Sequence, residues 1–312
     1  MLFLHKNNAM LSLEHTIFSA REAGFDLCGA APCHPQEQAR RRFEEWLREG
    51  CDADLQYLRR NIDKRFDPAL LVEEARSVIV CAVNYKNDTS LGYPAGCSAP
   101  RIASYARTAD YHRSIREMLR DLFALLEKRC PGLRGRAFVD SAPLAEKCWA
   151  REAGLGWQGR NSLLVTPQFG SFVLLGELVV NAPFDRYSEP CAEQGCGSCR
   201  ACLRACPKGA IGERRTIDAR RCISCLTVEA GDGPRETCGW LFGCDLCQSV
   251  CPYNRAAPLH TNPRFDPLFD PRELSDEWWN ALSEEEFDRR FADTPMARGG
   301  LPRLRRNLGS GR

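Results

Sequence analysis

The sequence lacks long hydrophobic runs. No apolar stretch reaches the roughly 18 residues that a membrane-spanning helix needs. The N-terminal residues also lack the apolar core of a secretory signal, because Met1–Leu4 are followed at once by His5, Lys6 and two asparagines. Met10 is an alternative start, since the structured pattern begins near Leu13. These absences predict a cytoplasmic protein that does not associate with a membrane.

A strong net charge is absent as well. The formal net charge is +2, which by itself gives no reason to expect a nucleic-acid partner. The C-terminal segment differs, because between residues 289 and 312 a single acid, Asp293, stands among seven arginines, namely Arg289, Arg290, Arg298, Arg303, Arg305, Arg306 and Arg312. Such a segment can neutralise phosphates. The alternative interpretation is a solvated or frayed terminus.

Cysteine, by contrast, is abundant, with 18 residues. Two runs carry a regular spacing, namely Cys196-x2-Cys199-x2-Cys202-x3-Cys206-Pro207 and Cys244-x2-Cys247-x3-Cys251-Pro252. This spacing is typical of bacterial proteins that hold two 4Fe–4S clusters. Zinc sites also use the x2 spacing, but zinc does not explain the two Cys-Pro endings. A disulfide framework is typical of short secreted chains, and this chain has 312 residues.

The spacing also predicts the ligands of each cluster, because the cysteine before proline reaches across to the other cluster. Cluster 1 is predicted to take Cys196, Cys199, Cys202 and Cys251, and cluster 2 to take Cys206, Cys244 and Cys247. Leu241 occupies the position of the expected fourth ligand of cluster 2. Cys222, Cys225 and Cys238 are the candidates to replace it. We favour Cys222, which follows a basic segment where ferredoxin-like chains often begin their second half.

The remaining cysteines follow no ligand spacing and are expected to be inert small hydrophobic residues. They are Cys28, Cys33, Cys51, Cys81, Cys97, Cys130, Cys148 and Cys191.

Hydrophobic periodicity predicts an α+β fold with three parts. Residues 10–185 are expected to form one α/β domain, residues 186–258 the two-cluster ferredoxin-like domain, and residues 259–312 a helical, arginine-rich segment without strands. The chain is expected to be a monomer. Within the first part, helices are expected over 35–49 and 110–129, with a further helix from 140 towards 153 and a helix leading into a strand over 15–31. Strands are expected over 77–83, where the strand is buried, and over 137–139, and paired strands are expected over 162–165 and 171–180 around a turn.

Several motifs together resemble one family. They are FVDSAP (138–143), AGLGWQGRN (153–161), GSF (170–172) with GEL (176–178), RCIS (221–224) with LTVE (226–229), and GCDLCQ (243–248). In this order they resemble the epoxyqueuosine reductases, and the likeness runs from about residue 15 to about residue 307. The chain departs from the family pattern at Arg160, where lysine is usual, and at Cys225, where an aromatic residue is usual. It also lacks the C-terminal helical-repeat extension that many members carry.

The resemblance implies a cobalamin-dependent iron–sulfur enzyme. Such an enzyme reduces epoxyqueuosine to queuosine at the wobble position of tRNA, the last step of queuosine synthesis, with electrons from an external low-potential donor. It implies a nitroreductase-like cobalamin-binding domain ahead of the ferredoxin-like domain. It also implies that Asp140 is the proton donor, that Arg60, Asp140, Arg160, Ser224 and Asp245 contact cobalamin, and that Cys222 completes cluster 2.

A carboxyl group that acts as an acid near neutral pH needs a raised pKa, which burial supplies. Asp140 follows the apolar residues Ala137–Val139, so we expect it to be buried. The alternative interpretation is that Asp140 caps the following helix. Tyr105, Tyr111 and His112 are further candidates for lining the pocket, whereas Trp157 is expected in the core.

Two other functions fit parts of the pattern. The first is a dehalogenase-like corrinoid reductase of another substrate, which the missing export signal disfavours. The second is an electron-transfer module that reduces cobalamin for another protein and needs no proton donor. A ferredoxin alone is excluded, because about 190 residues precede the cysteine runs.

Overall fold

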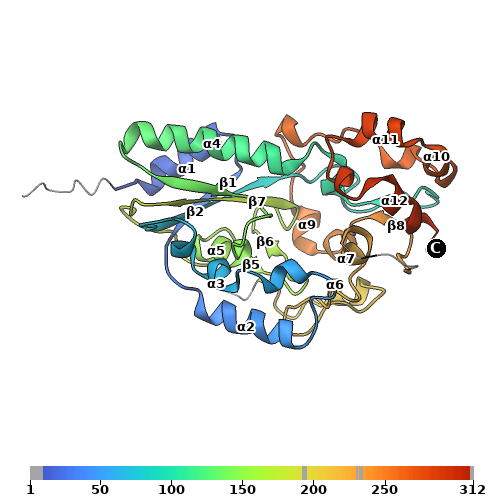
Figure 1. The fold of residues 1–312 in the computed structure, drawn as a ribbon, viewed down its shortest axis with the longest axis horizontal. Helices are drawn as coiled ribbons and strands as arrows, with labels where there is room; N and C mark the ends of the chain where they lie inside the picture. The colour runs from blue at the N-terminus through green and yellow to red at the C-terminus, as the bar shows by residue number, and fades with distance from the viewer. Residues whose placement is uncertain (1–9, 192–194, 230, 232–234, 310–312) are drawn as a thin grey trace, which may run out of the picture.

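A four-stranded antiparallel sheet forms the centre of the molecule (Figure 1). The computed structural model describes residues 10–191, 195–229, 231 and 235–309. The strand order is β1 (Leu27–Pro32), β2 (Ser77–Asn84), β7 (Val173–Val180) and β4 (Gly135–Phe138). Every residue of β2 is buried, because helices cover both faces of the sheet. The expected strands at 27–31, 77–83 and 137–139 are therefore confirmed to within two residues.

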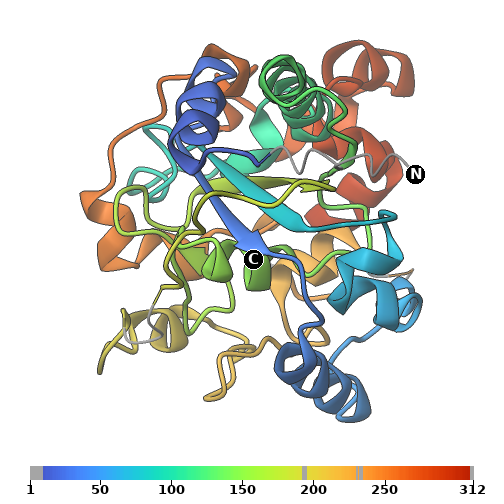
Figure 2. The ribbon, with the colours of Figure 1, turned by 90° about the vertical axis from the view of Figure 1, so that its left-hand side faces the viewer.

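Helices α1 (Leu13–Glu22) and α4 (Tyr111–Arg129) lie on one face of the sheet (Figure 2). Asp110 caps α4, and its carboxylate accepts the N–H of His112 at 3.0 Å. Ile115 and Leu119 of α4 pack over Gly176 of β7, where a Cβ atom would lie 2.5 Å from the nearest atom of Ile115. The predicted helix over 110–129 is thus confirmed, and a glycine sets its close approach to the sheet.

The other face is covered by α5 (Glu146–Glu152) and by the short hairpin of β5 (Trp157–Gln158) and β6 (Leu164–Val165). The predicted pairing of 162–165 with 171–180 is wrong, since β6 pairs with β5, and β7 pairs with β2 and β4. Gly156 allows this pairing, because a Cβ there would lie 2.2 Å from the Val165 carbonyl oxygen. Only a single bridge between Thr166 and Gly170 survives from the predicted hairpin.

The segment between β1 and β2 contains α2 (Glu37–Arg48), η1 (Gln56–Arg59), α3 (Ile62–Phe66) and η2 (Pro68–Leu70). The helix expected over 35–49 is α2. Tyr57 in η1 is about half exposed. This segment therefore places η1 at the surface, ahead of the strand that enters the core.

The cysteine runs lie among short helices, namely α6 (Ala201–Ala205), α7 (Ile223–Val228), α8 (Leu246–Ser249) and α9 (Pro252–Ala256). One short strand, β8 (Trp240–Phe242), pairs in parallel with β3 (Arg101–Ile102), which precedes η3 (Ser104–Arg107). The sequence patterns did not predict β8, which is only three residues long. Through this pairing, a segment near residue 100 joins the cysteine-rich part of the chain.

The C-terminal segment packs on β8. It contains η4 (Pro263–Phe265), η5 (Pro271–Glu273), α10 (Asp276–Ala281), α11 (Glu284–Phe291), η6 (Pro295–Arg298) and α12 (Gly300–Leu308). Trp279, Phe287 and Leu301 share one hydrophobic cluster with Ile102 and Phe242. As expected, no strand occurs among the described residues after 258. No described helix meets the length and hydropathy that crossing a bilayer requires.

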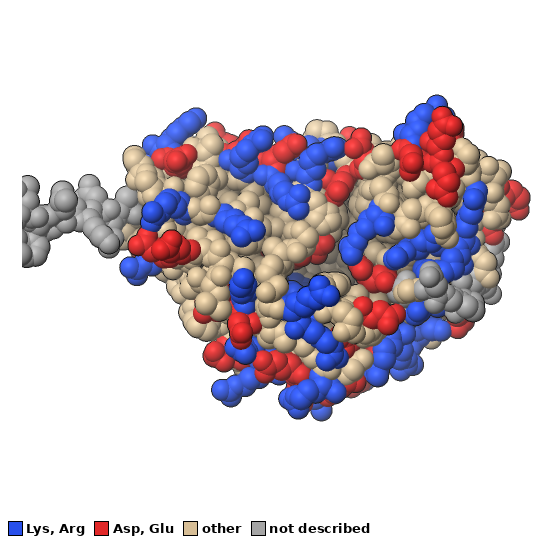
Figure 3. Space-filling view, in the orientation of Figure 1, with Lys and Arg blue, Asp and Glu red and all other residues tan. Residues whose placement is uncertain are grey.

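The arginines of this segment mostly hold its own structure. Arg305 donates to the carbonyl oxygens of Asn280 and Leu282, Arg303 donates to that of Val228, and Arg298 pairs with Glu229 at 3.0 Å. The frayed-terminus interpretation is therefore wrong for residues 289–309, while Arg312 lies outside the described residues. Basic and acidic side chains alternate over the face shown in Figure 3, as the small net charge requires.

Candidate functional site

Asp140 stands on the loop that follows β4, at an exposed position. Its φ is +44°, a left-handed conformation that aspartate adopts more readily than most residues. About half of its side chain is exposed, so the expectation that Asp140 is buried is wrong. The helix-cap interpretation is also wrong, because α5 begins at Glu146 and the cap position is Ala145. The Asp140 side chain is therefore accessible to solvent and does not cap a helix.

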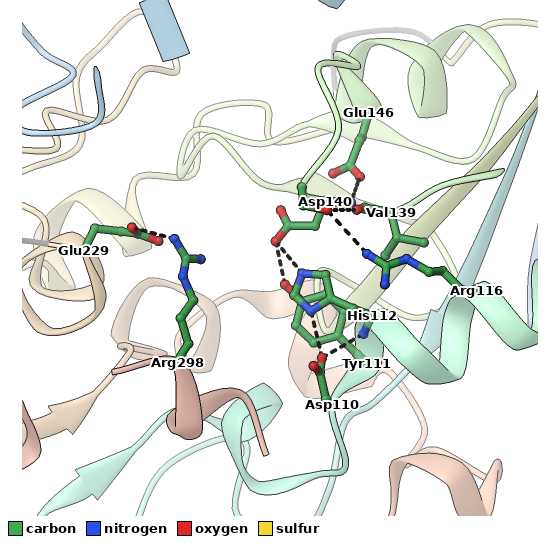
Figure 4. A network of polar contacts seen from close by, with 10 residues as sticks. Asp110, Tyr111, His112, Arg116, Val139, Asp140, Glu146, Glu229 and Arg298 are labelled. Atoms are coloured by element: carbon green, nitrogen blue, oxygen red, sulfur yellow. Dashed lines mark hydrogen bonds and ion pairs between the residues drawn. The ribbon is translucent and has the colours of Figure 1, made fainter. Parts of the chain in front are cut away.

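Two side chains bind the Asp140 carboxylate (Figure 4). The Tyr111 hydroxyl donates to its Oδ2 atom at 2.8 Å, and Nε2 of His112 lies 3.1 Å from the same oxygen. On its other side, Nδ1 of His112 lies 2.7 Å from Oδ1 of Asp110. His112 thus bridges two carboxylates, and the two pocket candidates at 111 and 112 are placed at Asp140.

The electrostatics of this group place the mobile proton on the histidine. The hydrogen bond from His112 lowers the pKa of Asp140, against the opposing effect of burial. The bond to Asp140 in turn raises the pKa of His112, and the bond to Asp110 adds to the rise. The raised carboxyl pKa required of a lone acid is therefore not found at Asp140. An imidazolium held against a carboxylate is an equivalent proton source, because the proton needs to move only along one hydrogen bond.

A second group of side chains lies across from Asp140, and we call the space between Asp140 and this group the opening (Figure 4). Arg298 of η6 and Glu229 form an ion pair on the side opposite Asp140 (Figure 4). Burial raises the pKa values of Tyr57 and Tyr105, and the charges of Glu229 and Asp140 contribute to both. The four residues come from η1, η3, the end of α7 and η6. The sequence had already singled out three of them: Tyr105 as a pocket candidate, Glu229 as the end of the LTVE motif, and Arg298 within the arginine-rich segment.

Asp245 and Ser224 lie on the cysteine side of the site. Asp245 is buried; its Oδ2 accepts the N–H of Ser104 at 2.7 Å, and its Oδ1 accepts the amide of Gln248 at 3.2 Å. Burial raises the pKa of Asp245, whose charge in turn acts on Tyr105. Ser224, in the first turn of α7, directs its backbone N–H at the Cys222 thiol. Asp245 and Ser224 therefore lie next to cysteines of the second group, Asp245 near Cys244 and Ser224 near Cys222.

The two predicted arginines lie apart from this centre. Arg60 follows η1 at an exposed position, close in sequence to Tyr57. Arg160 lies in the turn between β5 and β6 and donates to the carbonyl oxygen of Gly197 at 2.9 Å, beside the first cysteine run. The structure thus associates Arg160 with the cysteines of that run.

The thiols fall into two groups. Burial raises the pKa of the Cys251 thiol, and the nearby thiols of Cys196 and Cys199 raise it further. Burial also raises the pKa of Cys202, and its neighbours Cys196 and Cys251 add to that rise. Burial likewise raises the pKa of Cys244, and the neighbouring thiols of Cys222 and Cys206 add to the rise. The pKa of Cys247 is also raised by burial, with further contributions from the thiols of Cys244, Cys222 and Cys202. These mutual influences indicate that Cys196, Cys199, Cys202 and Cys251 lie near one another, as do Cys206, Cys222, Cys244 and Cys247.

The two rival thiols are placed differently. Burial raises the pKa of Cys225 to about 12, and among the cysteines only Cys222 adds to the rise. For Cys238 the neighbouring charges are Glu236, Lys208 and Cys206. Within the part of the chain that the structure describes, no three ligand side chains converge closely enough for a single metal ion. Of the eight cysteines outside the spacing, Cys81 and Cys130 are buried and the others are half-buried.

Comparisons with known proteins agree with this arrangement. The family model described as "Epoxyqueuosine reductase QueG, DUF1730" matches residues 65–141, and that of a 4Fe–4S double cluster binding domain matches residues 195–254. The epoxyqueuosine reductase of Cellulophaga algicola is 37% identical over 293 residues, covering 91% of this chain and 93% of that protein. The one from Escherichia coli is 35% identical, covering 92% and 77%.

Solved structures are similar as well. An epoxyqueuosine reductase in complex with an epoxyqueuosine-modified tRNA-Tyr stem loop superposes with a TM-score of 0.84 at 29% identity, covering 95% of this chain and 79% of that one. A second, from Bacillus subtilis, whose catalytic aspartate loop is swung out of the active site, gives 0.83 at 28% identity with the same coverage. The mixed α/β fold with a double-cluster domain is thus shared, and this chain belongs to the epoxyqueuosine reductase family.

Proposed function

We propose that this protein is an oxidoreductase that reduces epoxyqueuosine to queuosine at the wobble position of tRNA. One observation carries the proposal: the structure that holds eight cysteine thiols at ligand spacing also gathers Asp140, His112 and Tyr111 into one hydrogen-bonded group that could supply protons. The family relatives bear this name, and one of them was solved with an epoxyqueuosine-modified tRNA stem loop. The tRNA that carries the modified base is accordingly the proposed macromolecular partner.

The two thiol groups fit two 4Fe–4S clusters. Cluster 1 would take Cys196, Cys199, Cys202 and Cys251, and cluster 2 would take Cys206, Cys222, Cys244 and Cys247. Each group supplies the four thiolates that a cubane needs, and a cubane fills a larger space than a single ion. The Cys202 thiol raises the pKa of Cys247 in the other group, so these thiols are close and the two clusters would be neighbours. An external low-potential donor would supply electrons to them one at a time.

The residues beside cluster 2 include polar groups that suit one edge of cobalamin, and the pocket they line is smaller than a whole corrin. A pocket of about 240 Å³ adjoins Asp245 and Leu246, and it is lined by Trp240, whose buried indole N–H has no partner among the described residues. Such a donor suits the amide-rich rim of a corrin. We propose Ser224 and Asp245 as contacts from the cluster side, Asp140 from the opposite rim, and Arg60 and Arg160 as peripheral contacts. A reduced cobalt corrin would supply the strongly reducing centre that amino-acid side chains lack.

The chain's own residues would handle the protons. Removing the epoxide oxygen as water consumes two electrons and two protons, and it leaves a carbon–carbon double bond. Asp140 would protonate the departing oxygen, His112 would return a proton to Asp140, and Tyr111 would hold the carboxylate in place. The catalytic aspartate loop of the Bacillus subtilis relative supports assigning the acid to the loop that follows β4.

The finer organisation also remains our proposal. Residues 10–185 would be a nitroreductase-like cobalamin-binding domain, residues 186–258 the ferredoxin-like domain, and residues 259–312 the helical segment. We further propose a monomer that acts in the cytoplasm.

An anaerobic turnover assay tests the function. Protein with reconstituted clusters, cobalamin and a strong reductant is incubated with epoxyqueuosine-containing tRNA, and the nucleosides are identified by mass spectrometry. We expect queuosine only when cobalamin is present. Asp140→Asn should retain both clusters and cobalamin but form no product. Absence of queuosine from wild-type protein with intact cofactors would refute the proposal and favour another substrate or an electron-transfer role.

A further inference from the structure

A second carboxyl group lies directly behind Asp140 (Figure 4). Oε1 of Glu146, the first residue of α5, accepts the backbone N–H of Asp140 at 2.6 Å. The backbone of Asp140 is left-handed, which is unfavourable for a residue other than glycine and persists only where neighbouring contacts hold it. The Glu146 contact is made to this backbone, while the Asp140 side chain points to His112 and Tyr111.

The surroundings of Glu146 contain charges from four elements. Burial raises the pKa of Glu146 to about 7; the nearby Asp140 raises it further, whereas Lys147 on its own helix and His112 on α4 oppose the rise. The fourth neighbour is Glu177 of β7, which is fully buried. Neither carboxyl oxygen of Glu177 has a partner within the described residues. Burial therefore keeps Glu177 protonated at neutral pH, since a bare buried carboxylate is very costly. Glu146 is then the carboxyl whose charge changes near neutrality.

We propose that Glu146 is a positioning residue, which holds the Asp140 backbone in its left-handed conformation and so directs the Asp140 carboxylate at His112 and Tyr111. It does this in its ionised form, because a charged oxygen holds an N–H more strongly than a neutral one. This inference rests on the proposed function in assigning the proton donor to Asp140. Among the hydrogen bonds that the structure describes, Glu146 bonds to the Asp140 backbone and not to His112.

Three variants test this role in turnover. Glu146→Gln keeps an acceptor oxygen but no charge, Glu146→Ala removes the acceptor, and Glu152→Gln on the same helix is the control. We expect kcat to fall about tenfold in Glu146→Gln and about a hundredfold in Glu146→Ala, with KM for tRNA unchanged, as loss of one charge-assisted bond implies. Wild-type kcat should rise with pH around 7, and Glu146→Gln should lose that limb. Wild-type kcat and an unchanged pH profile in Glu146→Gln would overturn the proposal.

Amide hydrogen exchange of the loop over 139–142 gives a measurement independent of activity. At one pH, exchange at Asp140 should be about tenfold faster in Glu146→Ala than in wild type, and unchanged in Glu152→Gln. Equal exchange in all three proteins would overturn the positioning role. If wild-type protein makes no queuosine but the exchange difference is found, the proposed function fails and the positioning of Asp140 stands. Should Glu146→Ala not fold, Glu146→Gln with wild-type iron content carries both measurements.

Discussion

At the scale of single residues, the site depends on a histidine that the sequence offered only as a pocket candidate. His112 lies between two carboxylates, and its hydrogen bond is the largest influence lowering the pKa of Asp140. The same hydrogen bond shifts the two pKa values in opposite directions, raising that of His112 and lowering that of Asp140. The pair therefore stores one proton over a wider pH range than either group alone would.

We predict that His112→Gln lowers kcat by about 10²- to 10³-fold, because the proton store is lost. Without the imidazolium, the pKa of Asp140 should move upward, so the remaining activity should fall as pH rises. Single-turnover rates measured across pH check both statements, with the exposed His15→Gln on α1 as control. The double variant with Asp140→Asn should be no slower than Asp140→Asn alone, since the two residues act as a unit. Full activity of His112→Gln at every pH would contradict this interpretation.

The eighth cluster ligand is also decided by single residues. Cys222 contributes to the raised pKa values of both Cys244 and Cys247, whereas Cys225 is not among the main contributors to either. We predict that Cys222→Ala retains about half of the iron, because a cubane lacking one thiolate is lost during anaerobic purification. Cys225→Ala should keep the full content. Iron and sulfide analysis with electron paramagnetic resonance measures this directly, and full loading of Cys222→Ala would point to Cys225 or Cys238 instead.

At the scale of elements, the contact between α4 and the sheet holds the proton-donating residues in place. Gly176 of β7 leaves no room for a methyl group beneath Ile115 and Leu119. We predict that Gly176→Ala destabilises the protein by about 1–3 kcal/mol, because helix and strand must separate. Thermal unfolding of the holoprotein checks this. Gly231→Ala is the matched control, since no atom of the described residues beyond its chain neighbours lies within 4 Å of its added Cβ, and its effect should be near zero. An equal loss in both variants would refute the close-contact explanation.

At the scale of the whole molecule, the C-terminal segment supports the site from a distance. The backbone N–H of Asp110 donates to the carbonyl oxygen of Asp293 at 2.6 Å, and Arg298 reaches Glu229. The same segment buries Phe242 of β8 beneath Trp279 and Phe287. Regions that the sequence divides into three parts thus share one hydrophobic cluster and one site, because β3 and β8 connect them.

Stability of the whole molecule should depend on pH through the buried carboxyls. The pKa of Glu177 is raised well above 4.5, so its stabilising contribution is full below about pH 4.5 and is lost as pH rises toward the folded-state pKa. We predict that wild-type protein loses stability relative to Glu177→Gln as pH rises above about 4.5, by up to about 1.4 kcal/mol per pH unit. Thermal midpoints at equal cluster content measure this, with Glu14→Gln as an exposed control. Parallel curves for wild type and Glu177→Gln would show that Glu177 does not titrate as its burial requires.

The sequence by itself determined those features that depend on local spacing. Ligand spacing identified the two cysteine groups, and hydrophobic periodicity identified α4, because cubane ligation and helical amphipathicity both act over a few residues. The motif order identified the family. Local pattern was insufficient for β6, whose partner β5 is set by a glycine contact, and for β8, which is too short to leave a pattern.

The arrangement of the proposed proton-donating group follows from the fold and not from local sequence. Sequence reasoning expected a buried Asp140 with a raised pKa, and the structure instead has an exposed Asp140 whose pKa is lowered by His112. Asp110 and His112 lie at the start of α4 and Asp140 on the loop after β4, while Glu229 and Arg298 come from far along the chain. A pKa depends on the charges and burial around a group in space, and those distances exist only once the chain has folded.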